Sequence, residues 1–152
     1  MRWSIQVVCA LHRGVGIVDI ETGIVAEWIA NPETDMEHCD NRSNDGKCDA
    51  AGRFWYGTMN LRCGTAEGGR DGAGSLYCVG TDRSVTRAVP NLTIPNGLAW
   101  SSNNDTMYHI DTPTRSIDAY DFDLASGTIN NRRSSVRIPD GFGWPGMGAA
   151  LL

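Results

Sequence analysis

The sequence predicts an all-β protein of the propeller type, holding about three blades of that architecture. Three observations lead to this fold class: a glycine-rich composition, short strand-like segments bounded by turn residues, and an internal repeat. Glycine makes up 18 of the 152 residues, and a glycine inside a helix costs about 1 kcal/mol relative to alanine. No stretch keeps the i, i+3, i+4, i+7 spacing of apolar residues over three helical turns, so almost no helix is expected.

Short segments rich in β-branched and aromatic residues predict the strands. The clearest cover residues 16–21, 75–79 and 117–123, and most of them alternate between polar and apolar side chains. Glycine-containing segments such as 21–23 and 125–127 separate them. Glycine supplies the positive φ that tight hairpin connections require, so these segments are predicted to be turns.

Two pairs of similar segments indicate the repeat. Gly23 and Gly127 lie 104 positions apart (127 − 23) in matching strand-turn segments, and Gly52 and Asp105, each in a turn before an aromatic strand, lie 53 apart (105 − 52). The two offsets agree on a unit of about 52 residues, close to the length of a four-stranded propeller blade. We therefore expect one partial propeller domain over residues 1–152. Its open blade edges make self-association a hypothesis.

Composition and charge narrow the expected partners and compartment. A net charge of −5 disfavours nucleic acid and anionic membranes, which need clustered Lys and Arg. The five cysteines form no C-x-x-C pair and no zinc-finger spacing, and their odd number suggests free thiols in a reducing compartment. A signal peptide needs an apolar core, but polar residues interrupt the start of this sequence. No apolar run in the sequence is long enough to span a membrane. A cytoplasmic protein is expected.

Two polar segments carry the candidate chemistry. The first is N-R-S-N-D-G-K-C-D at residues 41–49, which precedes the predicted strand 53–59, and the second is I-P-N-G-L-A-W-S at residues 94–101. Taken separately, each predicts only a turn: Asp45-Gly46 would form the tip of a hairpin, and Asn-Gly is a common turn dipeptide.

Together with M-Y-H-I-D-T-P-T-R-S-I-D-A-Y-D-F-D at residues 107–123, these segments resemble the gluconolactonase family, which includes regucalcin and the luciferin-regenerating enzyme. The resemblance runs from about residue 10 to about residue 147 and leaves residues 1–10 and 148–152 as poorly matched termini. It implies a six-bladed propeller with one divalent cation (Ca²⁺, Zn²⁺, Mn²⁺ or Mg²⁺) at the mouth of the central channel. It also implies hydrolysis of a small-molecule sugar lactone, in which the cation polarises the lactone carbonyl and activates water.

The resemblance also implies roles for individual residues. Asn96 falls on the asparagine metal ligand of the family, which offers a side-chain oxygen to a hard cation. Arg42 and Asn44 fall on positions that contact substrate, where a guanidinium and an amide orient lactone oxygens. Asp45, in the same motif, is assigned a supporting role. No catalytic residue is assigned.

The chain departs from the family at three positions. The first metal ligand, a glutamate, has no counterpart, and the last, an aspartate in a P-D-G-M motif, is missing from W-P-G-M at residues 144–147, with Asp140 as the nearest substitute. Arg62 stands where the family tends to have acidic residues, which would change specificity. Two hypotheses stay open: a metal-dependent lactone hydrolase, truncated here, or a non-catalytic fragment or pseudoenzyme acting as a calcium-binding or interaction module.

Three further expectations concern single residues. His109 is predicted to be buried and hydrogen-bonded, and Asp111 to accept hydrogen bonds from nearby backbone N–H groups where its strand ends. The tryptophans are too dispersed to form a ligand platform and are predicted to lie in the core between blades: Trp3, Trp28, Trp55, Trp100 and Trp144.

Overall fold

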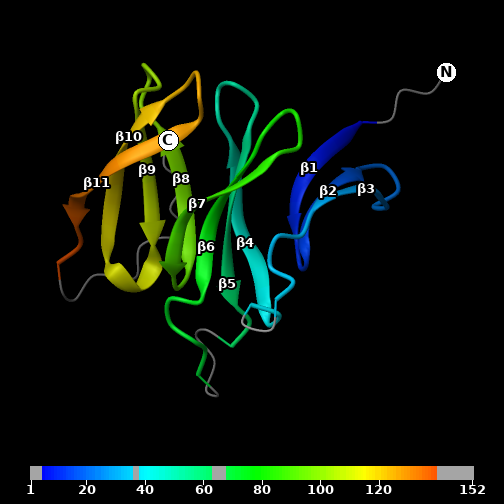
Figure 1. Ribbon diagram of the computed structural model, residues 1–152, viewed down its shortest axis with the longest axis horizontal. Coiled ribbons are helices and arrows are strands. Elements are labelled where there is room, and N and C mark those ends of the chain that lie inside the picture. The colour runs from blue at the N-terminus through cyan, green and yellow to red at the C-terminus, as the bar shows by residue number, and fades with distance from the viewer. Residues whose placement is uncertain (1–4, 36–37, 63–67, 140–152) are drawn as a thin grey trace.

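A computed structural model describes residues 5–35, 38–62 and 68–139, and within these ranges the chain forms three antiparallel sheets side by side (Figure 1). The first sheet has the order β1-β2-β3, the second β4-β5-β6-β7, and the third β8-β9-β10-β11. The strands are β1 (Gln6–Leu11), β2 (Gly14–Asp19), β3 (Val25–Ala30), β4 (Asn41–Cys48), β5 (Phe54–Asn60), β6 (Gly74–Val79), β7 (Val85–Leu92), β8 (Pro95–Trp100), β9 (Thr106–Asp111), β10 (Ser116–Asp123) and β11 (Thr128–Arg137). One 3₁₀ helix, η1 (Thr112–Thr114), follows β9. The all-β prediction is confirmed.

The repeat is visible in two turns of the same construction. In the β2–β3 turn the Asp19 carboxylate accepts the N–H of the residue two positions on, and Asp123 does the same in the β10–β11 turn. Gly23 and Gly127 donate to the carbonyl oxygens of those aspartates, with φ of 70° and 74°. Because the same hydrogen bonds occur in both turns, β2 and β3 in the first sheet correspond to β10 and β11 in the third. Within the described residues, the first sheet has no strand that corresponds to β8.

The hairpin tip predicted at Asp45-Gly46 is wrong. Strand β4 continues to Cys48, and the chain turns at residues 49–53. The buried Asp49 carboxylate directs this turn, because it accepts the backbone N–H groups of Ala51 and Arg53 and the side-chain N–H groups of Arg53 and Trp55. The indole N–H and the ion pair satisfy a carboxylate that is otherwise costly to bury.

The larger core lies between the second and third sheets. Trp55 on β5 is fully buried, and its ring meets the edges of Trp100 and Phe122 at centroid distances of 6.4 and 6.1 Å. Such edge contacts between aromatic rings are favourable beyond the area they bury. Aliphatic and other side chains from both sheets complete this core: Leu76, Cys78, Val89, Leu92, Leu98, Met107 and Tyr120.

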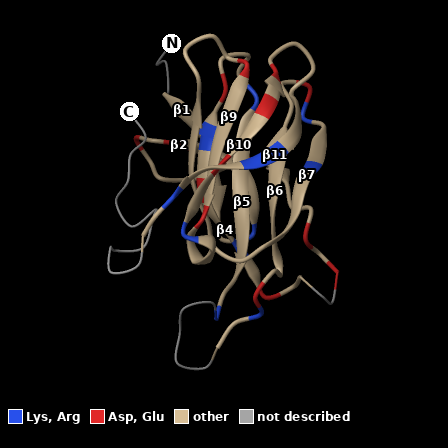
Figure 2. Ribbon diagram, turned by 90° about the vertical axis from the view of Figure 1, so that its left-hand side faces the viewer, with Lys and Arg blue, Asp and Glu red and all other residues tan. Residues whose placement is uncertain are grey.

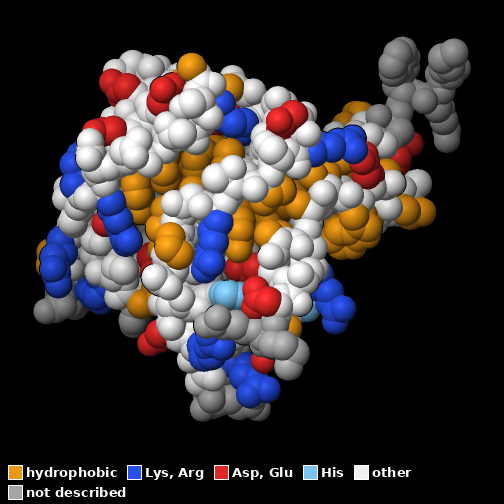
Figure 3. Space-filling model, in the orientation of Figure 1, with side chains coloured by type: hydrophobic (Ala, Val, Ile, Leu, Met, Phe, Trp, Pro, Cys, Tyr) orange, Lys and Arg blue, Asp and Glu red, His pale blue; other side chains and the backbone are white. Residues whose placement is uncertain are grey.

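A smaller core joins the first and second sheets. The rings of Tyr56 and Tyr77 stack with centroids 5.6 Å apart, and Val15 from β2 packs with them. The first sheet, in contrast, leaves apolar side chains at the surface (Figure 3), including Ile24 at 64% and Trp28 at 57% exposure. Trp28 is therefore not the core residue that was predicted.

The other tryptophans divide in two. Trp55 lies in the core as predicted, and Trp100, which is partly buried, packs against that core, whereas Trp3 and Trp144 fall outside the described residues.

Acidic side chains concentrate at strand ends and turns, as the charge-coloured ribbon shows (Figure 2). Asp82, Asp105 and Asp123 are fully exposed there, and hydrogen bonds from the serines and backbone N–H groups of their own turns lower the pKa of each carboxyl. These aspartates stabilise turns.

Within the part of the chain that the structure describes, no helix is long and apolar enough to cross a membrane.

His109 on β9 is buried, as predicted, but the described residues give its side chain no hydrogen bond. Its side chain is 1% exposed, and neither ring nitrogen has a hydrogen-bond partner among the described residues. Burial lowers its pKa from the ordinary 6.5 to about 4, although Asp118, its neighbour across the β9–β10 pair, acts in the opposite direction. The imidazole is therefore neutral at pH 7.

This burial predicts acid sensitivity. Between pH 6.5 and about 4, the unfolded chain binds a proton at His109 that the folded chain does not, so the free energy of unfolding falls as pH falls through this window. The loss attributable to His109 is on the order of 3 kcal/mol. A His109→Leu variant should be at least as stable at pH 7 and lose less stability by pH 4 in urea titrations. Equal acid losses in both proteins would contradict this, and the exposed His12→Leu serves as control.

Candidate functional site

Two bulges, one on β4 and one on β8, bring the predicted site residues together. The β4–β5 register shifts between Ser43 and Gly46, and the β8–β9 register shifts between Asn96 and Leu98, where Gly97 has a φ of +64°. Across the two bulges the Asn44 amide donates to Asn96 Oδ1 at 3.1 Å. These asparagines are 52 positions apart, which is the length of the repeat. Equivalent positions of successive repeats therefore meet in one site.

A chain of hydrogen bonds orients the site amides. The Arg42 guanidinium donates through Nη1 to Asn44 Oδ1 at 2.9 Å, and Asn44 Nδ2 donates to the Pro95 carbonyl as well as to Asn96. Asn96 Nδ2 in turn donates to Thr112 Oγ1 at 3.1 Å. Each amide has a donor facing its oxygen and an acceptor facing its nitrogen, so both orientations are defined.

Thr112 belongs to this site, although the sequence analysis did not identify it. It opens helix η1, is buried, and lies 16 positions after Asn96. Its place directly after the strand-ending Asp111 was the one available signal, and that signal predicts a local turn rather than contact with Asn96.

Asp111 supports the site in a different way from the one predicted. Its carboxylate accepts backbone N–H groups from Thr93, at 3.1 Å, and Ile94, at 2.7 Å, rather than from residues beside it. Burial raises the pKa of Asp111, and these two hydrogen bonds act against that rise. The contact holds the segment that leads into Pro95 and Asn96, so the start of β8 is fixed by the end of β9.

Asp45 links the two bulges through the backbone. One of its carboxylate oxygens accepts the Gly46 N–H at 2.9 Å, and the other accepts the Gly97 N–H at 2.7 Å. This geometry gives Asp45 a clear structural task between the second and third sheets. Its supporting role toward substrate stays a prediction, as do the substrate contacts of Arg42 and Asn44.

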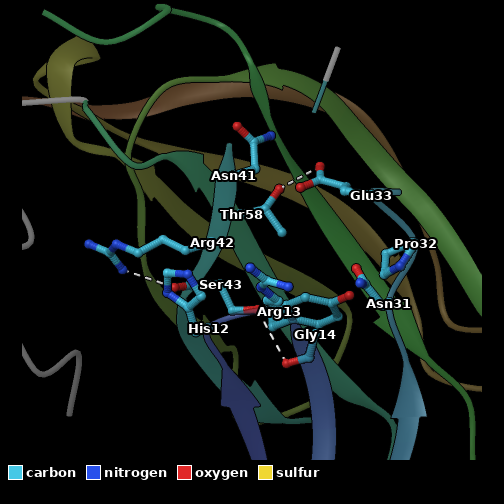
Figure 4. A pocket seen from close by; sticks show the side chains of 11 residues that line it. His12, Arg13, Gly14, Asn31, Pro32, Glu33, Asn41, Arg42, Ser43 and Thr58 are labelled. Atoms are coloured by element: carbon cyan, nitrogen blue, oxygen red, sulfur yellow. Dashed lines mark hydrogen bonds between the residues drawn. The ribbon is translucent and has the colours of Figure 1, made fainter. Parts of the chain in front are cut away.

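A small pocket opens beside Arg42, between the first and second sheets (Figure 4). The carboxylate in it is Glu33, which follows β3 and accepts hydrogen bonds from the hydroxyls of Thr58, at 2.8 Å, and Tyr77, at 3.2 Å. Burial, together with the charge of Glu33, raises the pKa of Tyr77 to about 12. The residues that line the pocket are His12, Arg13, Gly14, Asn31, Pro32, Glu33, Asn41, Arg42, Ser43, Tyr56 and Thr58.

The described residues do not form a complete site for a divalent cation. No group of three or more His, Cys, Asp or Glu residues within them could hold a metal ion. Asn96 contributes one amide oxygen, which already accepts the Asn44 N–H, whereas Ca²⁺ prefers about 6 to 8 oxygen ligands. Asp140, the substitute ligand suggested by the sequence, lies outside the described residues.

Comparison with known proteins identifies the family. The sequence profile described as "SMP-30/Gluconolactonase/LRE-like region" matches residues 3–148. The chain belongs to this family. Regucalcin from Gallus gallus is 41% identical over 117 residues, which make up 72% of this chain and 38% of that protein.

Solved structures agree with this assignment. A luciferin-regenerating enzyme superposes with a TM-score of 0.76 at 37% identity, covering 87% of this chain and 43% of that chain. Regucalcin from Agrobacterium tumefaciens, described as a calcium-binding protein, superposes with a TM-score of 0.72 at 28% identity, covering 85% of this chain and 41% of that chain. The resemblance seen in the motifs is confirmed, and these relatives share the propeller fold. The chain spans about two fifths of the length of each relative.

Replacing Asp45 tests its structural task. In Asp45→Ala the backbone N–H groups of Gly46 and Gly97 lose their acceptor, and we expect the free energy of unfolding to fall by about 2 kcal/mol in urea titrations. The control is Asp121→Ala, which removes an exposed carboxylate on β10. A loss no larger than that of the control would show that Asp45 does not link the two sheets.

Proposed function

We propose that this chain is the lactone-binding part of a sugar-lactone hydrolase, forming about three blades of a six-bladed propeller within one partial domain. The observation that carries the proposal is the continuous hydrogen-bond chain from Arg42 through Asn44 and Asn96 to Thr112. Polar side chains that are held in defined orientations on the strands of a rigid sheet are what substrate positioning requires. Membership of the gluconolactonase-like family supports sugar lactones as the substrate class.

The donors available at Arg42 suit a lactone. Its Nη1 is occupied by Ser43 and Asn44, while Nε and Nη2 form no hydrogen bond within the described residues. The half-buried guanidinium can therefore offer a second edge to ring or hydroxyl oxygens of a sugar. In this proposal Asn44 fixes the guanidinium, and Thr112 fixes the amide of Asn96.

Hydrolysis, in this proposal, depends on a divalent cation, Ca²⁺, Zn²⁺, Mn²⁺ or Mg²⁺, with Asn96 as one of its ligands. The remaining ligands have to come from outside the described residues, since no group of three or more His, Cys, Asp or Glu within them could hold a metal ion.

A second candidate function follows from that shortage. A chain that positions a sugar lactone but lacks a cation site would be a non-catalytic member of the family, acting as a binding or interaction module. The two candidates share the lactone-binding residues and differ in the cation.

Lactone hydrolysis tests the first candidate. We expect the chain to hydrolyse glucono-1,5-lactone faster than buffer alone does, as measured by the release of acid. Chelation of the cation by EDTA should remove this acceleration. Asn44→Ala should lower the rate at least tenfold, because it removes the acceptor that holds the Arg42 guanidinium. Asn130→Ala, on the exposed strand β11, is the matched control. Acceleration that is equal in both variants would argue against this site.

Cation binding separates the two candidates. Titration calorimetry with Ca²⁺, Mn²⁺ and Zn²⁺ should detect binding in the micromolar range if the chain is a hydrolase, and Asn96→Ala should abolish it. A lactone analogue that binds while no cation does would favour the non-catalytic module.

A further inference from the structure

The pocket beside Arg42 is lined by two arginines and one carboxylate, and one of these arginines, Arg13, has no partner among the described residues. Arg13 and His12 lie in the turn between β1 and β2, both are exposed, and both line the pocket with Arg42. Neither Arg13 nor His12 has a hydrogen bond or ion pair within the described residues. Two guanidinium groups, those of Arg13 and Arg42, thus line one small pocket in a chain of net charge −5.

Glu33 does not neutralise these groups directly. Its Oε1 accepts hydrogen bonds from the Thr58 and Tyr77 hydroxyls, and it forms no ion pair within the described residues. Figure 4 shows Glu33 beside Thr58 at one side of the pocket, whereas His12 and Ser43 lie toward Arg42. Glu33 keeps its negative charge but lies on the Thr58 side of the pocket, so the guanidinium groups are the charges nearest to a ligand at the Arg42 side.

The size of the pocket limits what can enter it. Its enclosed space is about that of one water molecule, so it admits the tip of a small group but no sugar ring. Arg42 is shared between this pocket and the amide chain of Asn44 and Asn96. A ring held at the two asparagines could then direct a substituent toward Arg13.

We propose that this pocket receives one oxygen of the anionic substituent, a carboxylate or a phosphate, of a sugar lactone, and that Arg13 and Arg42 at its rim are the donors of this subsite. This inference rests on the proposed lactone-binding function and specifies its substrate class. Guanidinium groups bind carboxylate and phosphate oxygens through paired N–H donors, and both anions present such oxygens. The preferred substrates are then acidic or phosphorylated lactones rather than neutral ones.

Stable ring analogues test the subsite without hydrolysis. The probes are 1,5-anhydroglucitol, its 6-carboxylate and its 6-phosphate, titrated calorimetrically into the full chain. We expect at least one anionic analogue to bind about tenfold more tightly than the neutral one, the effect of one charge-assisted hydrogen bond. That preference should shrink as NaCl is raised, because salt screens an exposed ion pair. Comparison of the two anionic analogues tells which anion the subsite takes.

Substitution of single arginines tests whether Arg13 causes the preference for the anionic analogue. Arg13→Gln should lower the affinity for the preferred anion about tenfold more than that for the neutral analogue, whereas Arg137→Gln, an exposed arginine at the end of β11, should change neither. Equal binding of neutral and anionic analogues, or an equal loss of both in Arg13→Gln, overturns the subsite and leaves the lactone-binding proposal standing. Failure of all three analogues to bind overturns both.

Discussion

The contact between Trp55 and the carboxylate of Asp49 is the interaction on which the site region depends. Asp49 closes the β4–β5 turn, and by accepting the indole N–H it fixes the ring of Trp55 between the second and third sheets. That ring meets Trp100 on β8 and Phe122 on β10. The same residues therefore set the turn of one sheet and the position of the next. The meeting of β4 and β8 depends on this packing.

The site uses irregularities in strands that are otherwise regular. A bulge frees backbone and side-chain groups from the ladder and turns them toward a neighbouring strand. On β4 the bulge presents Asn44 and Asp45, and on β8 it presents Asn96 and the N–H of Gly97. Asp45 and Asp111 then hold the two ends of this arrangement through backbone N–H groups. The carboxylates of Asp45 and Asp111 thus hold the backbone that carries the site asparagines, and this task requires no contact with a ligand.

Two kinds of buried polar group contrast among the described residues. Asp49 and Asp111 have their oxygens satisfied by several donors, so they define turns and strand starts. His109 and the hydroxyl of Tyr120 are equally buried but have no hydrogen-bond partner within the described residues. The first kind stabilises geometry, whereas the second reduces stability and, for His109, makes it depend on pH.

The sequence by itself determined the strands, the repeat of about 52 residues and the family, because period-2 patterning, turn glycines and motif order are local properties. It also singled out Arg42, Asn44 and Asn96, which the structure joins by hydrogen bonds. It could not reveal that Asp45-Gly46 lies in a bulge, since the same dipeptide also favours hairpin tips. Nor could it reveal Thr112, Glu33 or the distant acceptor role of Asp111. Those contacts join residues 16 to 44 positions apart, and the packing of sheets and loops, which only the tertiary structure decides, brings them together.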